Sequence, residues 1–252
     1  MSPFLLAAAV GLVIGSFLNV CIYRLPRRQS VVWPASRCPS CHRALVWYEN
    51  IPVLSYLALR GACRTCHARI SPVYPLVELL TAVVFVATLA QVGVGLLLAV
   101  RLVFACAMIV LAFIDLRHRI LPNAITVPGI VAGIVASAVV PPGWLASLIG
   151  ILAGGGILLL IAWIYERVRH QEGLGMGDVK MLAMIGAFLG WKLMLLTLVL
   201  SSLLGSVVGL LVILAAKGDM KHALPFGTFL AAGALVASLT GDAIITWYLG
   251  FY

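Results

Sequence analysis

The sequence predicts an all-α polytopic membrane protein of about eight transmembrane helices, with a small cytoplasmic zinc-binding segment between the first two. Hydrophobic residues make up 63% of its 252 residues and charged residues 10%, against about 45–50% and about 25% in soluble proteins. A soluble globule of this size could not bury so much apolar surface, and a disordered chain would be far more polar. Long apolar runs also alternate with short polar segments, and most reach the length of about 17–25 residues that crosses a bilayer.

The first apolar run covers residues 4–22 and ends in a basic sequence, so it predicts a retained helix rather than a cleaved signal. An extended polar segment with eight arginines follows at 24–70. Further apolar runs predict spans at 73–90, 94–114, 124–140, 144–165, 179–191, 193–216 and 226–249. We therefore expect three parts: a first transmembrane helix (1–23), a four-cysteine zinc segment (24–72) and a seven-helix membrane domain (73–252).

The distribution of charge predicts the topology. With the N-terminus outside, segments 24–70, 115–123, 166–180 and 217–225 face the cytoplasm, and they hold all of the 17 Lys and Arg residues except Arg101 and Lys192. Basic residues resist translocation, so the opposite orientation is disfavoured. The positive-inside distribution of Lys and Arg therefore accounts for the net charge of +9. It predicts no nucleic-acid partner, because no basic stripe with interleaved aromatic residues occurs outside the polar segment.

Small residues inside the spans predict close helix packing. Gly150 and Gly154 have Gly-x-x-x-Gly spacing in the run at 144–165, and Gly205 and Gly209 have it in the run at 193–216. This spacing allows the backbones of two helices to approach closely.

Two C-x-x-C pairs in the polar segment predict a structural zinc site. The pairs are separated by 21 residues and comprise Cys38, Cys41, Cys63 and Cys66. Four thiolates at such a spacing can surround Zn²⁺ tetrahedrally and close a segment too short to hold a hydrophobic core. Redox dithiols and an exposed disulfide are the alternatives, and His42 and His67, which follow the two pairs, are competing ligands.

Three of the eight acidic residues, Glu78, Asp115 and Asp178, lie inside or at the edge of apolar runs. A carboxylate at the bilayer centre costs about 2.5–3.5 kcal/mol, so such residues indicate function. The predicted topology brings Asp115 and Asp178 to the cytoplasmic face at the same depth. Two carboxylates in a partly dry site cannot easily both ionise. The pair suits water attack on an amide: the ionised member accepts a proton from water, and the protonated member donates to the carbonyl oxygen.

Each acidic residue also has a structural interpretation. Asp115 could pair with Arg117 or Arg119 at a helix end, and Asp178 could be an acid of a first helical turn. Glu78 is expected to pair with a basic residue of the polar segment; the alternatives are that it stabilises structure or belongs to a second active site. Glu49 is expected to be a solvated loop charge.

Glycines at 173, 175 and 177 precede Asp178. They remove side chains from the approach to this residue and would let an extended peptide backbone come close.

These features together resemble the type IV prepilin peptidases, the leader peptidases and N-methyltransferases of type IV pili and type II secretion, which are intramembrane aspartic proteases. The resemblance covers nearly the whole chain. Besides the cysteine pairs, its motifs are residues 15–20 with 24–26, 51–56 with 60–61, 70–75 leading to Glu78, Asp115 with 121–123, 175–180, and 225–227.

The resemblance implies that Asp115 and Asp178 are the catalytic pair, supported by Gly175, Gly177, Lys180 and Glu78. It implies a prepilin or pseudopilin substrate whose basic leader is cut at the cytoplasmic face of the bacterial inner membrane. It also implies N-methylation of the new N-terminus with S-adenosylmethionine, an activity linked to the cysteine-bearing segment.

Three other functions are weighed. A peptidase-only member would lack the methyl transfer. A proton-coupled transporter would place carboxylates near mid-membrane and show internal symmetry between its halves, and the sequence predicts neither. A non-enzymatic scaffold would use the zinc segment to bind partners.

Overall fold

The structure, a computed structural model, describes residues 2–169, 175–215 and 225–250. Within these residues the chain is helical apart from two isolated β-bridges. Parts of the expected cytoplasmic segments 166–180 and 217–225, including Gly173, lie outside the described residues. The chain divides into two compact units, Met1–Leu98 and Ala99–Tyr252.

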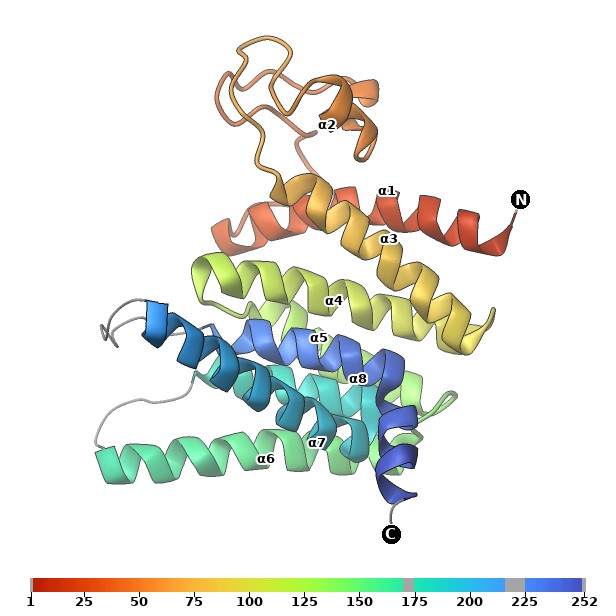
Figure 1. Cartoon of the computed structure of the whole chain (residues 1–252), viewed down its shortest axis with the longest axis vertical. Coiled ribbons are helices and arrows are strands. Elements are labelled where there is room, and N and C mark those ends of the chain that lie inside the picture. The colour runs from red at the N-terminus through yellow and green to blue at the C-terminus, as the bar shows by residue number, and fades with distance from the viewer. Residues whose placement is uncertain (1, 170–174, 216–224, 251–252) are drawn as a thin grey trace. The chain divides into compact units, whose positions relative to one another are not determined.

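The described elements alternate long helices with one small irregular region. In chain order they are α1 (Pro3–Arg24), η1 (Leu25–Arg27), η2 (Trp47–Asn50), α2 (Leu54–Ala58), α3 (Val73–Val92), α4 (Leu96–His118), α5 (Asn123–Ser137), α6 (Trp144–Arg169), α7 (Met176–Ala215) and α8 (Phe226–Leu249). Figure 1 shows their arrangement within each unit.

Six of the described helices are long and apolar enough to cross a membrane: α1, α3, α4, α6, α7 and α8. The chain is therefore a multi-span membrane protein. The eight expected spans relate to these six in two places. The run at 124–140 forms α5, which has 15 residues and is shorter than a typical crossing helix. The runs at 179–191 and 193–216 both lie in α7, which has 40 residues and a non-helical backbone at Gly190, so the expected division between the two runs falls at a break in the helix.

Helix α7 changes direction at Gly190 (Figure 1). This residue has φ 74° and ψ 174°, a conformation that few residues other than glycine adopt. A Cβ at this position would lie 2.8 Å from Cβ of Pro142. Gly190 thus allows both the break and the close approach of the connection between α5 and α6.

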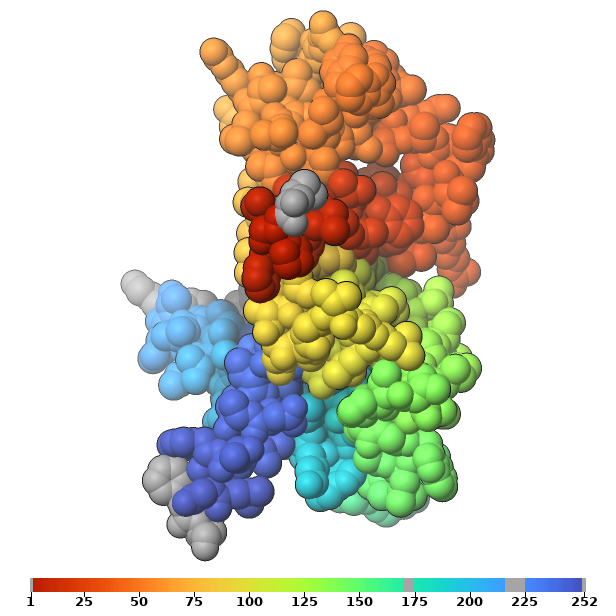
Figure 2. All heavy atoms as spheres, turned by 90° about the vertical axis from the view of Figure 1, so that its right-hand side faces the viewer, coloured from red at the N-terminus to blue at the C-terminus, as the bar shows by residue number. Residues whose placement is uncertain are grey.

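In the first unit, α1 packs against α3 through glycines. A Cβ on Gly11 would lie 2.6 Å from Cα of Ala82, and one on Gly15 would lie 2.6 Å from Cα of Glu78. The Asn19 amide adds an interhelical hydrogen bond to the carbonyl oxygen of Tyr74, at 3.0 Å. The polar segment between these helices (orange in Figures 1 and 2) projects from one end of the pair.

In the second unit, α7 lies at the centre of the packing. Its first part is almost continuously buried and contacts α5, α6 and α8. The expected close packing at Gly150 and Gly154 is confirmed, because a Cβ there would lie 2.5 and 2.8 Å from the carbonyl oxygens of Gly186 and Leu182. At Gly205 the corresponding contact, with the ring of Phe229, is an ordinary 3.5 Å.

Arg101 lies outside the predicted cytoplasmic segments and is buried in α4. Its guanidinium donates to the backbone carbonyl and the hydroxyl of Ser238 in α8, at 2.5 and 2.9 Å. The side chain thus links two membrane helices and satisfies a buried charge.

We expect Gly150→Ala to destabilise the protein by about 1–3 kcal/mol, because the new methyl group would force α6 away from the backbone of α7. The midpoint of thermal unfolding in detergent measures the effect. Gly156→Ala, in the same helix but with nothing within 4 Å of the added Cβ, is the matched control and should be neutral or stabilising. Equal midpoints for the two variants would contradict close packing at Gly150.

Candidate active site and cysteine cluster

Asp115 lies in the last turn of α4 and is only 5% exposed. Its Oδ2 accepts hydrogen bonds from the backbone N–H of Thr228 at 2.7 Å and from the Thr228 hydroxyl at 3.1 Å. Thr228 is in the first turn of α8, and its hydroxyl also lies 3.2 Å from the carbonyl oxygen of Ala112. The start of α8 thus fixes the orientation of the carboxyl group.

This arrangement determines which oxygen of Asp115 can carry a proton. A backbone N–H can only donate, so Oδ2 of Asp115 acts as an acceptor. The two donors at Oδ2 therefore favour Oδ1 as the oxygen that carries a proton. Thr228 was not identified from the sequence, although its position directly after the Pro225–Gly227 motif is a signal that could have identified it.

Asp178 lies in the first turn of α7 and is half-buried. Its backbone N–H donates to the carbonyl oxygen of Gly175 at 3.1 Å, which closes the turn. The charge of Asp115 acts on the carboxyl group of Asp178. Both expected catalytic residues lie in the unit Ala99–Tyr252, and the charge of one acts on the other.

A continuous path of contacts connects the surroundings of the two aspartates through Leu121. A Cβ on Gly227 would lie 3.0 Å from Oδ2 of Asp115 and 2.9 Å from Cδ1 of Leu121. A Cβ on Gly177 would lie 3.0 Å from Cβ of Leu121. Both glycines thus make room for the same leucine side chain, which joins the starts of α7 and α8 to the end of α4.

Gly175 differs from these two glycines because it is exposed. A Cβ there would lie 3.5 Å from Oδ2 of Asp178, an ordinary contact distance. The Asp178 carboxyl group would therefore tolerate a small side chain at this position.

Among the described residues, Lys180 forms no ion pair with Asp115 or Asp178. Its ammonium group donates to Oδ1 of Asn123 at 3.0 Å and so links α7 to the first residue of α5. Asp115 also forms no ion pair with Arg117 or Arg119. The one salt bridge among the described residues joins Arg43 and Glu49. Arg119 acts on Asp115 only through its charge.

The four cysteines of the polar segment meet in one cluster, with their sulfur atoms within 4.8 Å of one another. The expected four-cysteine grouping is confirmed, and neither His42 nor His67 belongs to it. Each pair is closed by two equivalent backbone hydrogen bonds, at 3.0 and 2.9 Å around Cys38 and at 2.9 and 3.0 Å around Cys63. Both histidines have left-handed backbones, with φ of 57° and 56°, so the two turns are alike.

The electrostatics of the cluster suit a cation. The backbone N–H groups of Cys66 and Thr65 lower the pKa of Cys63 to about 6. Although the N–H of Ala68 favours the Cys66 thiolate, burial and the neighbouring sulfurs raise the pKa of Cys66 to about 11. Four thiolates at this distance repel one another and need a positive ion among them, so the donor set fits tetrahedral Zn²⁺.

Glu49 is not the solvated charge that the sequence suggested, because it is only 8% exposed. The Arg43 guanidinium donates to its two carboxylate oxygens at 2.7 and 2.8 Å, and the N–H of Val46 donates at 3.0 Å. The hydrogen bond from Arg43 is the main reason that the pKa of Glu49 is lowered. Arg43 also faces the sulfur of Cys63, so the ion pair braces the cluster.

Glu78 also differs from its expected pairing with a basic residue. Its Oε2 accepts a hydrogen bond from the backbone N–H of Val53 at 2.8 Å, and the hydroxyl of Ser16 donates to its carboxylate. It therefore ties α3 to α1 and to the chain just before α2. Like the cysteine cluster, it belongs to the unit Met1–Leu98.

The fold and the two clusters define an all-helical multi-span membrane protein with a four-cysteine segment and a carboxyl pair at its helix ends. The family model described as "Bacterial Peptidase A24 N-terminal domain" matches residues 9–92, and the one described as "Type IV leader peptidase family" matches residues 102–210. The chain belongs to the type IV leader peptidase family. This membership confirms the resemblance found in the sequence.

Curated relatives support the same assignment. A protein of Aeromonas salmonicida is 38% identical over 98% of this chain and 94% of its own length, and one of Pseudomonas aeruginosa is 35% identical over 96% and 92%. One of Myxococcus xanthus is 47% identical over 82% of this chain, and the match spans 62% of that relative. All three are named "Prepilin leader peptidase/N-methyltransferase". No solved structure matches the chain.

We expect Cys38→Ser to remove most of the zinc from the purified protein, because a tetrahedral site loses one of its four thiolates. Elemental analysis of the metal bound per protein measures the loss. Cys106→Ser, in α4 and outside the cluster, is the matched control and should keep the wild-type zinc content. Full zinc content in the Cys38 variant would show that the cluster is not the zinc site.

Proposed function

We propose that this chain is a membrane endopeptidase that removes the basic leader from type IV prepilins or pseudopilins and then methylates the new N-terminus. The observation that carries the peptidase assignment is the path from Asp115 through Gly227, Leu121 and Gly177 to the turn that holds Asp178. Asp115, Leu121 and Gly177 lie within residues 102–210, which the leader peptidase family model matches, and Gly227 follows them at the start of α8.

The proposed reaction is amide hydrolysis by the two aspartates. One carboxylate accepts a proton from water, and the water oxygen attacks the scissile carbonyl carbon while the protonated partner donates to the carbonyl oxygen. Collapse of the tetrahedral intermediate breaks the C–N bond, and the leaving nitrogen takes a proton from the carboxyl pair. On Asp115, Oδ1 is the oxygen that exchanges the proton, since Oδ2 accepts the bonds from Thr228.

The glycines around the site suit a peptide substrate. Gly227 packs closely against Asp115 and Leu121, and Gly177 packs closely against Leu121, so we assign both glycines a packing role. The exposed Gly175 beside Asp178 is instead the proposed approach for an extended peptide backbone. Lys180 supports the site indirectly, by holding Asn123 at the start of α5.

For the topology we propose eight crossing segments in the bacterial inner membrane, with the N-terminus on the periplasmic side. Eight segments follow if α5 crosses and if the two parts of α7 on either side of Gly190 cross separately. Asp115 and Asp178 then lie at the cytoplasmic face, where a substrate helix can stay in the bilayer while its leader is cut. The positive-inside distribution of Lys and Arg supports this orientation.

The N-methylation rests on the name shared by the relatives. A peptidase-only enzyme is the alternative. We propose that S-adenosylmethionine supplies the methyl group and that a structural zinc ion holds the four-cysteine segment together. Glu78 supports this segment through Val53.

Asp115→Asn and Asp178→Asn should each reduce leader cleavage by at least about 10²–10⁴-fold, because an amide can neither accept nor donate the transferred proton as a carboxyl group does. The assay incubates the detergent-solubilised enzyme with a prepilin that carries an intact leader and measures the product mass. Asp242→Asn, near the far end of α8, is the control and should cleave normally. Cleavage by both aspartate variants would show that the aspartic mechanism is wrong.

Thr228→Val should lower kcat for cleavage by about 10- to 100-fold, the effect of losing a hydrogen bond to a charged group, while KM stays near the wild-type value. Thr228→Ser keeps the hydroxyl and should retain most of the activity, because the backbone N–H bond and the side-chain donor both remain. If serine and valine behave alike, the hydroxyl has no role in positioning Asp115.

A further inference from the structure

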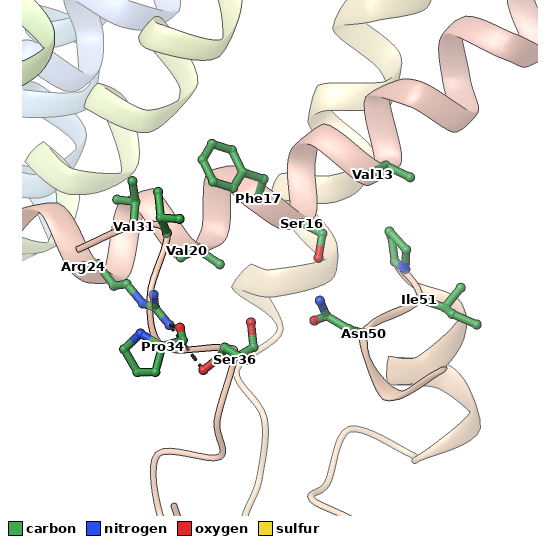
Figure 3. Close-up of a pocket in the computed structure, with 13 residues that line it drawn as sticks. Val13, Ser16, Phe17, Val20, Arg24, Val31, Pro34, Ser36, Asn50 and Ile51 are labelled. Carbon is green, nitrogen blue, oxygen red and sulfur yellow. Dashed lines mark hydrogen bonds between the residues drawn. The ribbon is translucent and has the colours of Figure 1, made fainter. Parts of the chain in front are cut away.

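A groove of about 650 Å³ lies along α1, between that helix and the polar segment (Figure 3). Its lining is mostly apolar and belongs entirely to the first unit, so it holds neither aspartate. The contacts that fix the turn of Asp178 lie in the second unit instead. They come from residues 119–123, the strap that joins α4 to the first residue of α5.

The start of α7 is weak as an isolated helix. Gly177 lies next to Asp178 in its first turn, and Gly175 directly precedes the helix. Glycine has more backbone freedom than any other residue and weakens a helix in which it occurs. The Asp178 N–H itself donates to the carbonyl oxygen of Gly175, at 3.1 Å. The local sequence therefore does not hold Asp178 in one place, and its position depends on contacts with other segments.

The strap begins on the residue that carries the other carboxyl group. Arg119 has a left-handed backbone, with φ of 53°, and its N–H donates to the carbonyl oxygen of Asp115 at 2.8 Å. Such a bond ends a helix, so α4 stops in the turn that carries Asp115. At the other end, the carbonyl oxygen of Pro122 accepts the N–H of Ile125 at 3.0 Å. Both ends of the strap are thus fixed by backbone hydrogen bonds.

Between these ends the strap contacts α7 on both sides of Asp178 in the chain. Leu121 packs against Gly177, where an added Cβ would lie 3.0 Å from Cβ of Leu121. Asn123 accepts a hydrogen bond from the Lys180 ammonium group through Oδ1, at 3.0 Å. The positive end of the helix dipole disfavours a cation this close to the start of α7. The amide oxygen therefore gives the ammonium group a partner that its own helix does not offer.

We propose that Asn123 is a positioning residue of the peptidase: by holding Lys180, it fixes the first turn of α7, and with it the Asp178 carboxyl group, against the end of α4. The inference rests on the proposed function and adds a residue to that same site. Asn123 touches no reacting atom in this scheme. It complements Thr228, which orients the opposite member of the carboxyl pair.

The separation of the two carboxyl groups determines how they share a proton. Their interaction weakens with distance, and two interacting carboxyl groups titrate in two steps whose separation reports that interaction. The charged or titratable groups at this end of the packed helices are Asp115, Arg117, His118 and Arg119 of α4 and the strap, Lys180 of α7, and Tyr165, Glu166, Arg167 and Arg169 of α6. Residues 123–137 of α5 and 225–241 of α8 contribute none. Asn123→Ala changes none of these charges, so a changed pH profile in this variant reports a changed geometry.

Asn123→Ala should lower kcat for leader cleavage by about 3- to 10-fold, the effect of losing an exposed hydrogen bond to a charged group, with KM within about 2-fold of wild type. The two limbs of its pH profile should also move closer together, because the carboxyl groups interact less. Asn123→Asp keeps an acceptor for Lys180 and should retain kcat. Equal losses in the alanine and aspartate variants would contradict the positioning role.

Lys180→Met should resemble Asn123→Ala, and the double variant should be no worse than either single variant, because both substitutions remove the same bond. If Lys180→Met lowers kcat further in the Asn123→Ala background, Lys180 acts on the substrate directly and the proposal is wrong. Ser147→Ala is the matched control. It removes a 2.8 Å bond from the Ser147 hydroxyl to the carbonyl oxygen of Ala187, further along the same part of α7, and should keep the wild-type pH profile.

Hydrogen exchange of the full detergent-solubilised chain, without substrate, tests the geometry independently of turnover. Backbone amides of residues 177–184 should exchange faster in Asn123→Ala than in the wild type, because the start of α7 opens more easily, and no faster in Ser147→Ala. Wild-type exchange and wild-type kcat in Asn123→Ala would overturn this inference alone. A wild-type enzyme that cannot cleave leaders would instead contradict the proposed peptidase.

Discussion

Polar groups in the apolar helices of this chain must find their hydrogen-bond partners within the protein, because the surrounding hydrocarbon offers none. Asp115 is bonded by the first turn of α8, Arg101 by Ser238 further along the same helix, and Glu78 by the backbone of Val53. Each bond joins segments that are distant in the chain. The polar side chains are therefore also the groups that specify how the helices are arranged.

The same constraint explains the density of small residues at helix contacts. Helices in a membrane gain little from hydrophobic association, so they depend on close backbone packing. Gly15 brings α1 to the residue that carries the Glu78 carboxylate, and Gly227 brings α8 to Asp115. These glycines are packing residues, and they also determine where the side chains of Asp115 and Glu78 can lie.

The fold class could be predicted from the sequence, because apolar runs and charge asymmetry are local properties. The division of the spans was harder. The run at 124–140 was expected to span, but α5 is short, whereas the expected division between the runs at 179–191 and 193–216 agrees with the break in α7 at Gly190. The cysteine cluster could be predicted because two C-x-x-C turns close locally. The environments of Glu49 and Glu78 were misjudged, since their exposure depends on contacts with residues elsewhere in the chain.

By itself, the sequence determined that this is a multi-span membrane protein of the leader peptidase family, and it predicted which acids and cysteines are candidates for its chemistry. Composition, run length and motif spacing belong to the chain in any conformation. Only the tertiary structure decided that Thr228 orients Asp115, that Leu121 connects the glycines near both aspartates, and that Asn123 accepts a hydrogen bond from Lys180. Those relations are contacts between segments far apart in sequence, so they exist only once the helices have packed.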